Sequence, residues 1–193
     1  MNAEVILALP GLVIWLFPLY RQYKTEYFNF FLVMAAATPA ALALAFLIGG
    51  KTNNYFPSFY LLLLTAFLRK KEFYYTGIII SIILAFALNR LHFANIWLFT
   101  IPLAISFLIM LILLTQLSSD AFGKGIVNLF TLLLFIYFCI DIAKLFDMVV
   151  KIDPGYKMYL VGSVAQYFFA AAFCFISCNT KTFKINLNKP GRG

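Results

Sequence analysis

The sequence predicts an all-α integral membrane protein, a bundle of seven transmembrane helices with the N-terminus outside and the C-terminus in the cytoplasm. Of its 193 residues, 64% are hydrophobic and 11% are charged, and the mean hydropathy is +0.94. An average soluble domain has about 45–50% apolar and about 25% charged residues, so the charged residues here are too few to cover a water-facing surface. The composition excludes a soluble globular domain, a disordered chain and a disulfide-stapled secreted domain.

Seven apolar stretches support this class. A helix needs about 20 mostly apolar residues to cross a hydrocarbon core of roughly 30 Å. The predicted helices span about 3–20, 27–48, 53–68, 73–88, 96–117, 126–146 and 157–178. Continuous apolar runs do not fit the alternating strands of a β-barrel. Because the connections are too short to fold alone, we expect one transmembrane helical domain, 1–179, followed by a basic tail, 180–193.

The first stretch should remain as a helix, because the residues before it lack the basic start of a cleaved signal peptide. In the second, Ala37, Ala41 and Ala45 form a stripe of small residues that lets another helix approach closely, and Pro39 predicts a kink.

The third and fourth stretches are short, and the hairpin between them holds Arg69, Lys70, Lys71 and Glu72. A re-entrant hairpin would bury these charges, at roughly 2.5–3.5 kcal/mol for each basic residue. Two complete crossings are therefore favoured.

The fifth stretch contains Pro102, which predicts a second kink. In the seventh, Gly162 and Gln166 belong to a small and polar patch suited to contact between helices. Most aromatic residues are expected to face lipid or to lie at helix ends, as at Tyr27 and Tyr55. Tyr137, deep in the sixth stretch, needs a hydrogen-bond partner.

The basic residues predict the orientation. Ten of them lie in one set of alternate loops and the tail, and four in the other set. Lys and Arg concentrate on the cytoplasmic side of membrane proteins, so the tail is expected there. The positive charge is therefore expected to meet anionic lipid rather than nucleic acid, in a membrane that we expect to be a prokaryotic inner membrane.

The sixth stretch and its end carry four ionisable residues. Asp141, Lys144, Asp147 and Lys151 are spaced by three, three and four, so all four share one helical face. Ionisable groups inside a membrane helix point to a functional site because hydrocarbon penalises them. With Tyr137 they are our candidates for a ligand or ion site.

Other polar groups are predicted at the same outer level. Glu4, Arg90 and His92 lie near the outer ends of the first, fourth and fifth helices. Together with the Asp141 face they suggest an outward-facing polar cup. In the simpler interpretation, Asp141 pairs with Lys144, whose ammonium group extends toward water, and no site exists.

The sequence offers little for catalysis, and we expect neither a cofactor nor a metal site. One histidine excludes HExxH and multi-histidine sites. No GxSxG, Walker or GxGxxG motif is present, and the three cysteines have the pattern of small apolar residues.

Two functions therefore compete. The first is a small-solute or ion carrier, channel or receptor that uses the cup near Asp141. The second is an accessory or regulatory membrane subunit, which assembles with itself or with a partner protein through the small-residue stripe and the tail. A membrane enzyme comes third.

Overall fold

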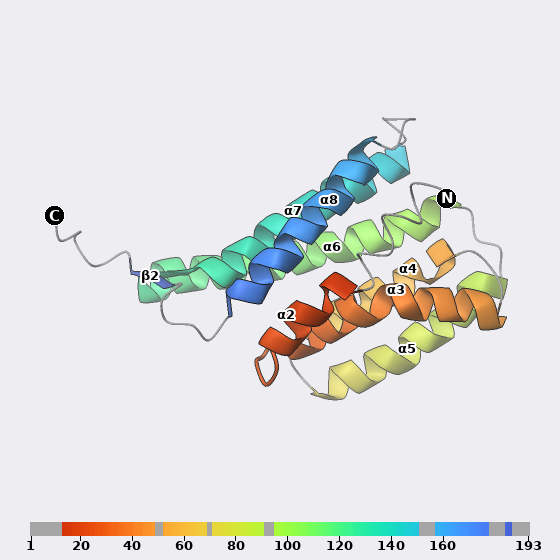
Figure 1. Cartoon of the computed structure of the whole chain (residues 1–193), viewed down its shortest axis with the longest axis horizontal. Helices are drawn as coiled ribbons and strands as arrows, with labels where there is room; N and C mark the ends of the chain where they lie inside the picture. Colours follow the sequence, from red (N-terminus) through yellow and green to blue (C-terminus); the bar gives the residue numbers. More distant parts are fainter. Residues whose placement is uncertain are drawn as a thin grey trace.

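The computed structural model describes residues 13–48, 52–68, 71–90, 95–150, 157–177 and 184–186. Most of these residues are helical, which confirms the all-α prediction for this part of the chain (Figure 1). The elements, in chain order, are α2 (Leu16–Arg21), α3 (Phe28–Ile48), the 3-10 helix η1 (Thr52–Tyr55), α4 (Phe56–Phe67), α5 (Lys71–Arg90), α6 (Asn95–Ser118), the π-helix η2 (Ser119–Gly123), β1 (Ile126–Asn128), α7 (Leu129–Val150), α8 (Lys157–Phe175) and β2 (Lys184–Asn186).

Three of the described helices are long and apolar enough to cross a membrane. The qualifying ranges are Phe28–Leu47, Ile96–Gly123 and Leu129–Val150, which correspond to α3, α6 with η2, and α7. The apolar parts of α4, α5 and α8 within the described residues are shorter than a full crossing requires. Membrane integration is thus supported by three helices, and the seven-crossing bundle stays a prediction.

The connection between α6 and α7 differs from the expected polar loop. Helix α6 continues through η2, and Gly125 then ends it with φ 61°, a left-handed conformation that glycine adopts without strain. Residues 126–128 form β1, although they were expected in a helix, because they pair antiparallel with β2. The Asn128 side chain then accepts a hydrogen bond from the Phe130 backbone N–H at 3.0 Å, so α7 begins at Leu129.

Helices α6, α7 and α8 run side by side (Figure 1). Helix α2 packs against α8 and α4 packs against α6, whereas α5 packs on α4. Helix α6 packs extensively against α7, and α7 also packs against α8. Helix α4 is central in the other half, because it contacts α3, α5 and α6. The side chains of α4 are therefore placed to reach the middle of the bundle.

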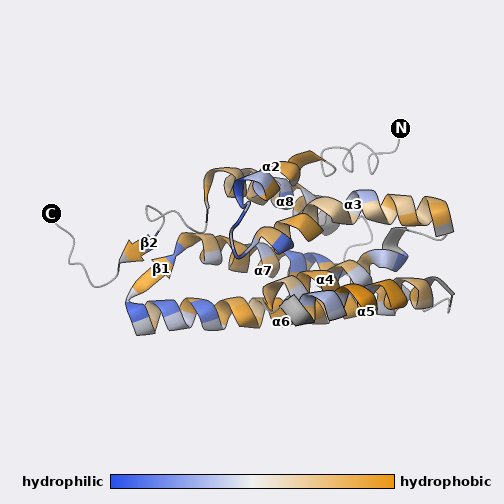
Figure 2. Cartoon of the chain, turned by 90° about the horizontal axis from the view of Figure 1, so that it is seen from below, coloured by the Kyte–Doolittle hydropathy of each residue, from blue (hydrophilic) through white to orange (hydrophobic). Residues whose placement is uncertain are grey.

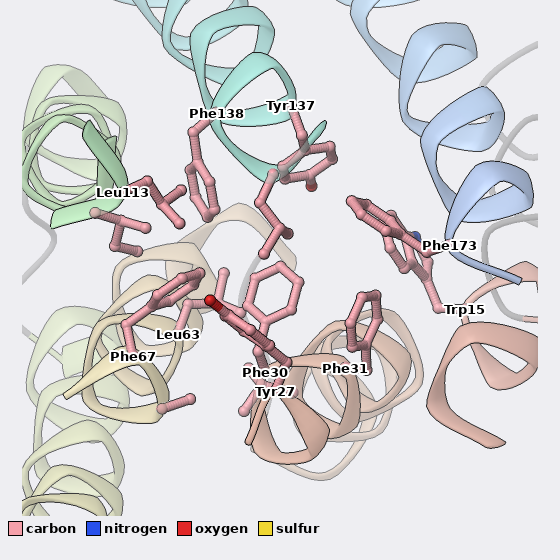
Figure 3. Packing of buried hydrophobic residues seen from close by; sticks show 14 of the residues in the cluster. Trp15, Tyr27, Phe30, Phe31, Leu63, Phe67, Leu113, Tyr137, Phe138 and Phe173 are labelled. Carbon is pink, nitrogen blue, oxygen red and sulfur yellow. The ribbon is translucent and has the colours of Figure 1, made fainter. Parts of the chain in front are cut away.

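An aromatic core fills the space between α2, α3, α4, α6, α7 and α8 (Figure 3). Phe31 and Phe173 meet edge to face with ring centres 5.3 Å apart, and Phe30 meets Phe67 at 5.2 Å. Tyr27 belongs to this core, and its hydroxyl group donates to Gln116 at 3.3 Å. The expectation that most aromatic residues face lipid is therefore wrong for this group, because aromatic rings also pack well with one another.

Hydrophobic residues run along the helices of the bundle (Figure 2), and many of the large ones are exposed on its outside. Large aliphatic side chains are exposed along α5, among them Ile79, Ile80 and Ile83, and Phe46 is exposed near the end of α3. A continuous apolar surface of this kind is unfavourable in water. It fits contact with lipid.

Gln22 joins the beginning of the described chain to the end of α8. Its side chain is fully buried, and its amide group donates hydrogen bonds to the carbonyl oxygen atoms of Ile176 at 2.8 Å and Phe173 at 3.4 Å. Ser177 donates to the Gln22 amide oxygen at 3.4 Å. The last carbonyls of a helix have no partner within that helix, so Gln22 satisfies groups that would otherwise be buried without one.

We expect Gln22→Leu to lower the free energy of unfolding by about 1–3 kcal/mol, because it leaves buried carbonyls without donors. Chemical denaturation in mixed micelles measures this change. Lys124→Ala is the control, since it removes only an exposed ion pair with Asp120, worth about 0–1 kcal/mol. A smaller loss for Gln22→Leu than for the control would show that this link does not stabilise the fold.

Helices α4 and α5 approach each other closely at Gly77. A β-carbon added there would lie 2.3 Å from Thr65 Cγ2 and 2.8 Å from Thr65 Cβ. Gly77, Ser81 and Ala85 form the buried face of α5 at a spacing of four, a small-residue pattern that allows helices to approach. The sequence analysis did not single out this stripe.

Gly77→Ala should destabilise the protein by about 1–3 kcal/mol, because the new methyl group forces α4 and α5 apart. Thermal unfolding in detergent is the measurement. Thr65→Ala in the same chain should restore part of the loss by removing the nearest methyl and hydroxyl groups. Gly123→Ala is the matched control, since nothing lies within 4 Å of its added β-carbon. Equal losses of thermal stability in Gly77→Ala and Gly123→Ala would contradict the close contact between α4 and α5.

Candidate functional site

Asp141 lies near the middle of α7 and is only 1% exposed. Helix α7 ends at Val150, four residues later than expected. Asp141 is therefore nine residues before the helix end, or about 14 Å along the axis. This is deeper than the one to two turns expected for the floor of an outward-facing cup.

Three other helices direct hydrogen-bond donors at the Asp141 carboxylate. The Tyr60 hydroxyl on α4 is 2.9 Å from Oδ1 and 3.0 Å from Oδ2. The Ser106 hydroxyl on α6 donates to Oδ2 at 2.8 Å, and the Gln166 amide on α8 donates to Oδ1 at 3.2 Å. Both carboxylate oxygens are thus occupied, and α4, α6, α7 and α8 meet at one side chain. We call these four residues the Asp141 cluster.

The members of the Asp141 cluster lie at similar depths in their helices. Tyr60 is eight residues after the start of η1, and Ser106 is 11 residues after the start of α6. Gln166 is nine residues after the start of α8. If these helices cross a membrane, the cluster is a polar layer near its middle.

Lys144, one turn beyond Asp141, is partly buried, and its ammonium group attracts the carboxylate. Its aliphatic stem lies against Gly162 of α8, where an added β-carbon would be 3.0 Å from Lys144 Cδ. Asp147 is buried one turn further along the same face. α7 therefore places the three described members of the predicted ionisable face inside the bundle.

Tyr137 faces the aromatic core one turn before Asp141. Its hydroxyl group lies 3.9 Å from the sulfur of Met34 on α3, and its ring meets Trp15 and Phe169 edge to face. The Tyr137 ring therefore marks the border between the aromatic core and the Asp141 cluster.

The side chains of the remaining predicted site residues fall outside the part of the chain that the structure describes. Glu4 and His92 lie outside the described residues, as do Lys151 and the side chain of Arg90, the last residue of α5. Membership of these groups in a cup stays a prediction.

The predicted packing residues occupy two places. Ala41 is buried with Tyr55 and Ala85, and Ala45 packs against this group, while Ala37 is partly buried. Pro39 is exposed within α3. Gly162 and Gln166 face α7, where they contact Lys144 and Asp141.

Sequence analysis missed Tyr60 and Ser106. Each is a hydroxyl-bearing residue within a strongly apolar helix, and a buried hydroxyl needs a partner. That signal marks them as candidates, but only the packing of α4 and α6 against α7 shows which group they bind.

The Asp141 cluster brings a carboxylate together with two hydroxyl groups and the amide nitrogen of Gln166. Carboxylate and hydroxyl oxygens are groups that can bind protons and hard cations. No group of three or more His, Cys, Asp or Glu side chains that could hold a metal occurs among the described residues. Cys139 and Cys174 are unpaired there, and the Cys139 thiol lies 3.8 Å from the Met110 sulfur.

Comparison with protein-family models, with curated proteins and with solved structures gave no match. The function is therefore inferred from the geometry of the chain itself.

We expect Ser106→Ala to lower the free energy of unfolding by about 1–3 kcal/mol, because a hydrogen bond to a charged acceptor is lost. In an Asp141→Asn background, Ser106→Ala should lower the free energy of unfolding by a smaller amount, since the acceptor is no longer charged. Denaturation of the wild type, the two single variants and the double variant in mixed micelles gives the coupling energy between the hydroxyl and the carboxylate. Ser119→Ala, at an exposed position, is the control. Equal costs of Ser106→Ala in both backgrounds would show that hydroxyl and carboxylate are not coupled.

Proposed function

We propose that the chain is a multi-pass membrane carrier for a small cation, either a proton or Na⁺, and that Asp141 binds this cation. The observation that carries the proposal is a buried carboxylate that receives hydrogen bonds from three other helices. Acidic residues inside membrane helices are costly, and they usually belong to ion or proton pathways. Many carriers bind their ions near the membrane midplane, between helices that move against one another.

The proposed topology has seven crossings, with the N-terminus outside and the tail in the cytoplasm of a prokaryotic cell. The positive-inside bias then places the starts of η1, α6 and α8 and the end of α7 on the outer side. Measured from these ends, the four residues of the Asp141 cluster lie eight to 11 residues deep. We therefore replace the outward-facing cup near Asp141 with a closed site at mid-depth.

On binding, the cation would replace some of the hydrogen bonds within the Asp141 cluster. A proton would neutralise the carboxylate, whereas Na⁺ would take the carboxylate oxygens and the hydroxyl oxygens of Tyr60 and Ser106 as ligands. In either case, binding changes the bonds that link α7 to α4, α6 and α8. Pro102, one turn before Ser106, removes a main-chain hydrogen bond from α6 and permits bending beside the site.

Cation flux into proteoliposomes tests this function. A potassium gradient with valinomycin sets the membrane potential, and an internal pH dye and ²²Na⁺ uptake report the two candidate ions separately. We expect one of the two fluxes to exceed that of protein-free vesicles, and Asp141→Asn to reduce it at least tenfold, because the amide carries no charge for the ion.

Asp120→Asn is the matched control, since it makes the same chemical change at an ion pair on η2. It should leave the flux unchanged. A wild-type flux in the Asp141→Asn protein, or no flux above protein-free vesicles for either ion, would reject the cation-carrier function.

One observation favours the second candidate, an accessory or regulatory membrane subunit. The Asp141 carboxylate is closed to solvent and both of its oxygens already accept hydrogen bonds, as in a polar joint that only fixes helix positions. This function predicts that the purified protein carries no ion flux. It also predicts a defined oligomer or a bound partner polypeptide by native mass spectrometry.

A further inference from the structure

A cavity of about 150 Å³ lies away from the Asp141 cluster, between α3, η1, α4 and α5. Its walls are almost entirely apolar and include the aromatic rings of Tyr55, Phe59 and Phe86. An apolar cavity of about this volume can hold a molecule the size of benzene.

Two serine residues line this cavity, Ser58 from α4 and Ser81 from α5. The two residues are 5% and 3% exposed, and neither hydroxyl has a hydrogen-bond partner in the described part of the chain. A helical serine usually points to solvent or bonds back to its own helix. A buried hydroxyl without a partner destabilises the fold, so two beside one cavity indicate a missing acceptor.

The cavity is held open by the packing around it. The contact between Gly77 and Thr65 fixes the crossing of α4 and α5 one turn before Ser81. One turn after Ser81, the small side chain of Ala85 leaves the space unfilled. Ser58 and Tyr60 are two residues apart, so they point to nearly opposite faces of α4, and the cavity is separate from the Asp141 cluster.

A ligand can reach the cavity from the apolar outside of the bundle. Ile82 and Phe86 line it and are 53% and 50% exposed. They lie on the same α5 surface as the exposed Ile79 and Ile83. Access from this side suits a molecule dissolved in lipid.

We propose that this cavity binds a membrane-soluble molecule whose ring-sized apolar head carries a carbonyl oxygen. The ring would occupy the volume among the aromatic walls. The carbonyl oxygen has two lone pairs, and Ser58 and Ser81 each supply one hydroxyl donor. An aliphatic tail on such a head would leave past Ile82 and Phe86 into the lipid.

The binding test uses the full chain in nanodiscs, with 4,4-difluorocyclohexanone as a ¹⁹F NMR reporter. Cyclohexanone and methylcyclohexane, which have the same number of heavy atoms, are compared as competitors at equal concentration in the lipid phase. We expect cyclohexanone to displace the reporter about tenfold better, because only the ketone accepts the serine hydrogen bonds. Equal displacement by both competitors overturns the proposal, as does the absence of reporter binding.

Variants separate binding from folding. Ser58→Ala and Ser81→Ala should each weaken reporter binding about fivefold, the effect of one hydrogen bond, while the unfolding temperature of the unliganded protein stays the same or rises. Ala85→Leu should abolish binding by filling the cavity. Ala104→Leu, on an exposed face of α6, should bind as the wild type does. A lower unfolding temperature in both serine variants, or unchanged binding in them or in Ala85→Leu, contradicts the site.

Discussion

The meeting of four helices at the Asp141 carboxylate is the constraint on which the rest of the bundle depends. Hydrogen bonds are directional, so Tyr60, Ser106 and Gln166 set the rotation of α4, α6 and α8 about their own axes. Apolar contacts between lipid-exposed helices do not fix rotation to the same degree, because lipid tails are as apolar as leucine. A single buried acid thus specifies how four helices present their faces.

The aromatic core follows from the same arrangement. With Asp141 turned inward, α7 also directs Tyr137 and Phe138 toward the centre, where Phe138 meets Phe67 of α4 at 5.8 Å. Edge-to-face contacts of this kind require particular ring orientations. The polar cluster and the aromatic core therefore reinforce one another along one face of α7.

Helix positions were largely predictable because apolar run length determines them directly. The second stretch, 27–48, agrees with α3 within one residue, and 96–117 agrees with α6 within one residue at each end. The predicted start of α7 was wrong, since a stretch as short as Ile126–Asn128 fits a strand as well as a helix until its partner at 184–186 is known. Composition alone also could not tell that Tyr27 and Phe31 face a core rather than lipid.

Only Asp141 and Gln166 of the Asp141 cluster could be predicted from the sequence. Asp141 was conspicuous because an acid is rare in an apolar helix, but its donors come from residues 25 to 81 positions away. Hydroxyl groups in apolar runs are frequent enough that sequence does not rank Tyr60 or Ser106 above Thr131 or Ser163. Their role depends on which helices touch, and the order of apolar stretches does not specify that.

The Gln22 cap has a consequence for the order of synthesis. Its acceptors at the end of α8 follow it by 151 and 154 residues. At about 5–20 residues per second, this interval lasts roughly 8–30 s on the ribosome. During that time, the Gln22 amide lacks both of these acceptors. Its link to α8 can therefore form only after the chain has been synthesised as far as Ile176.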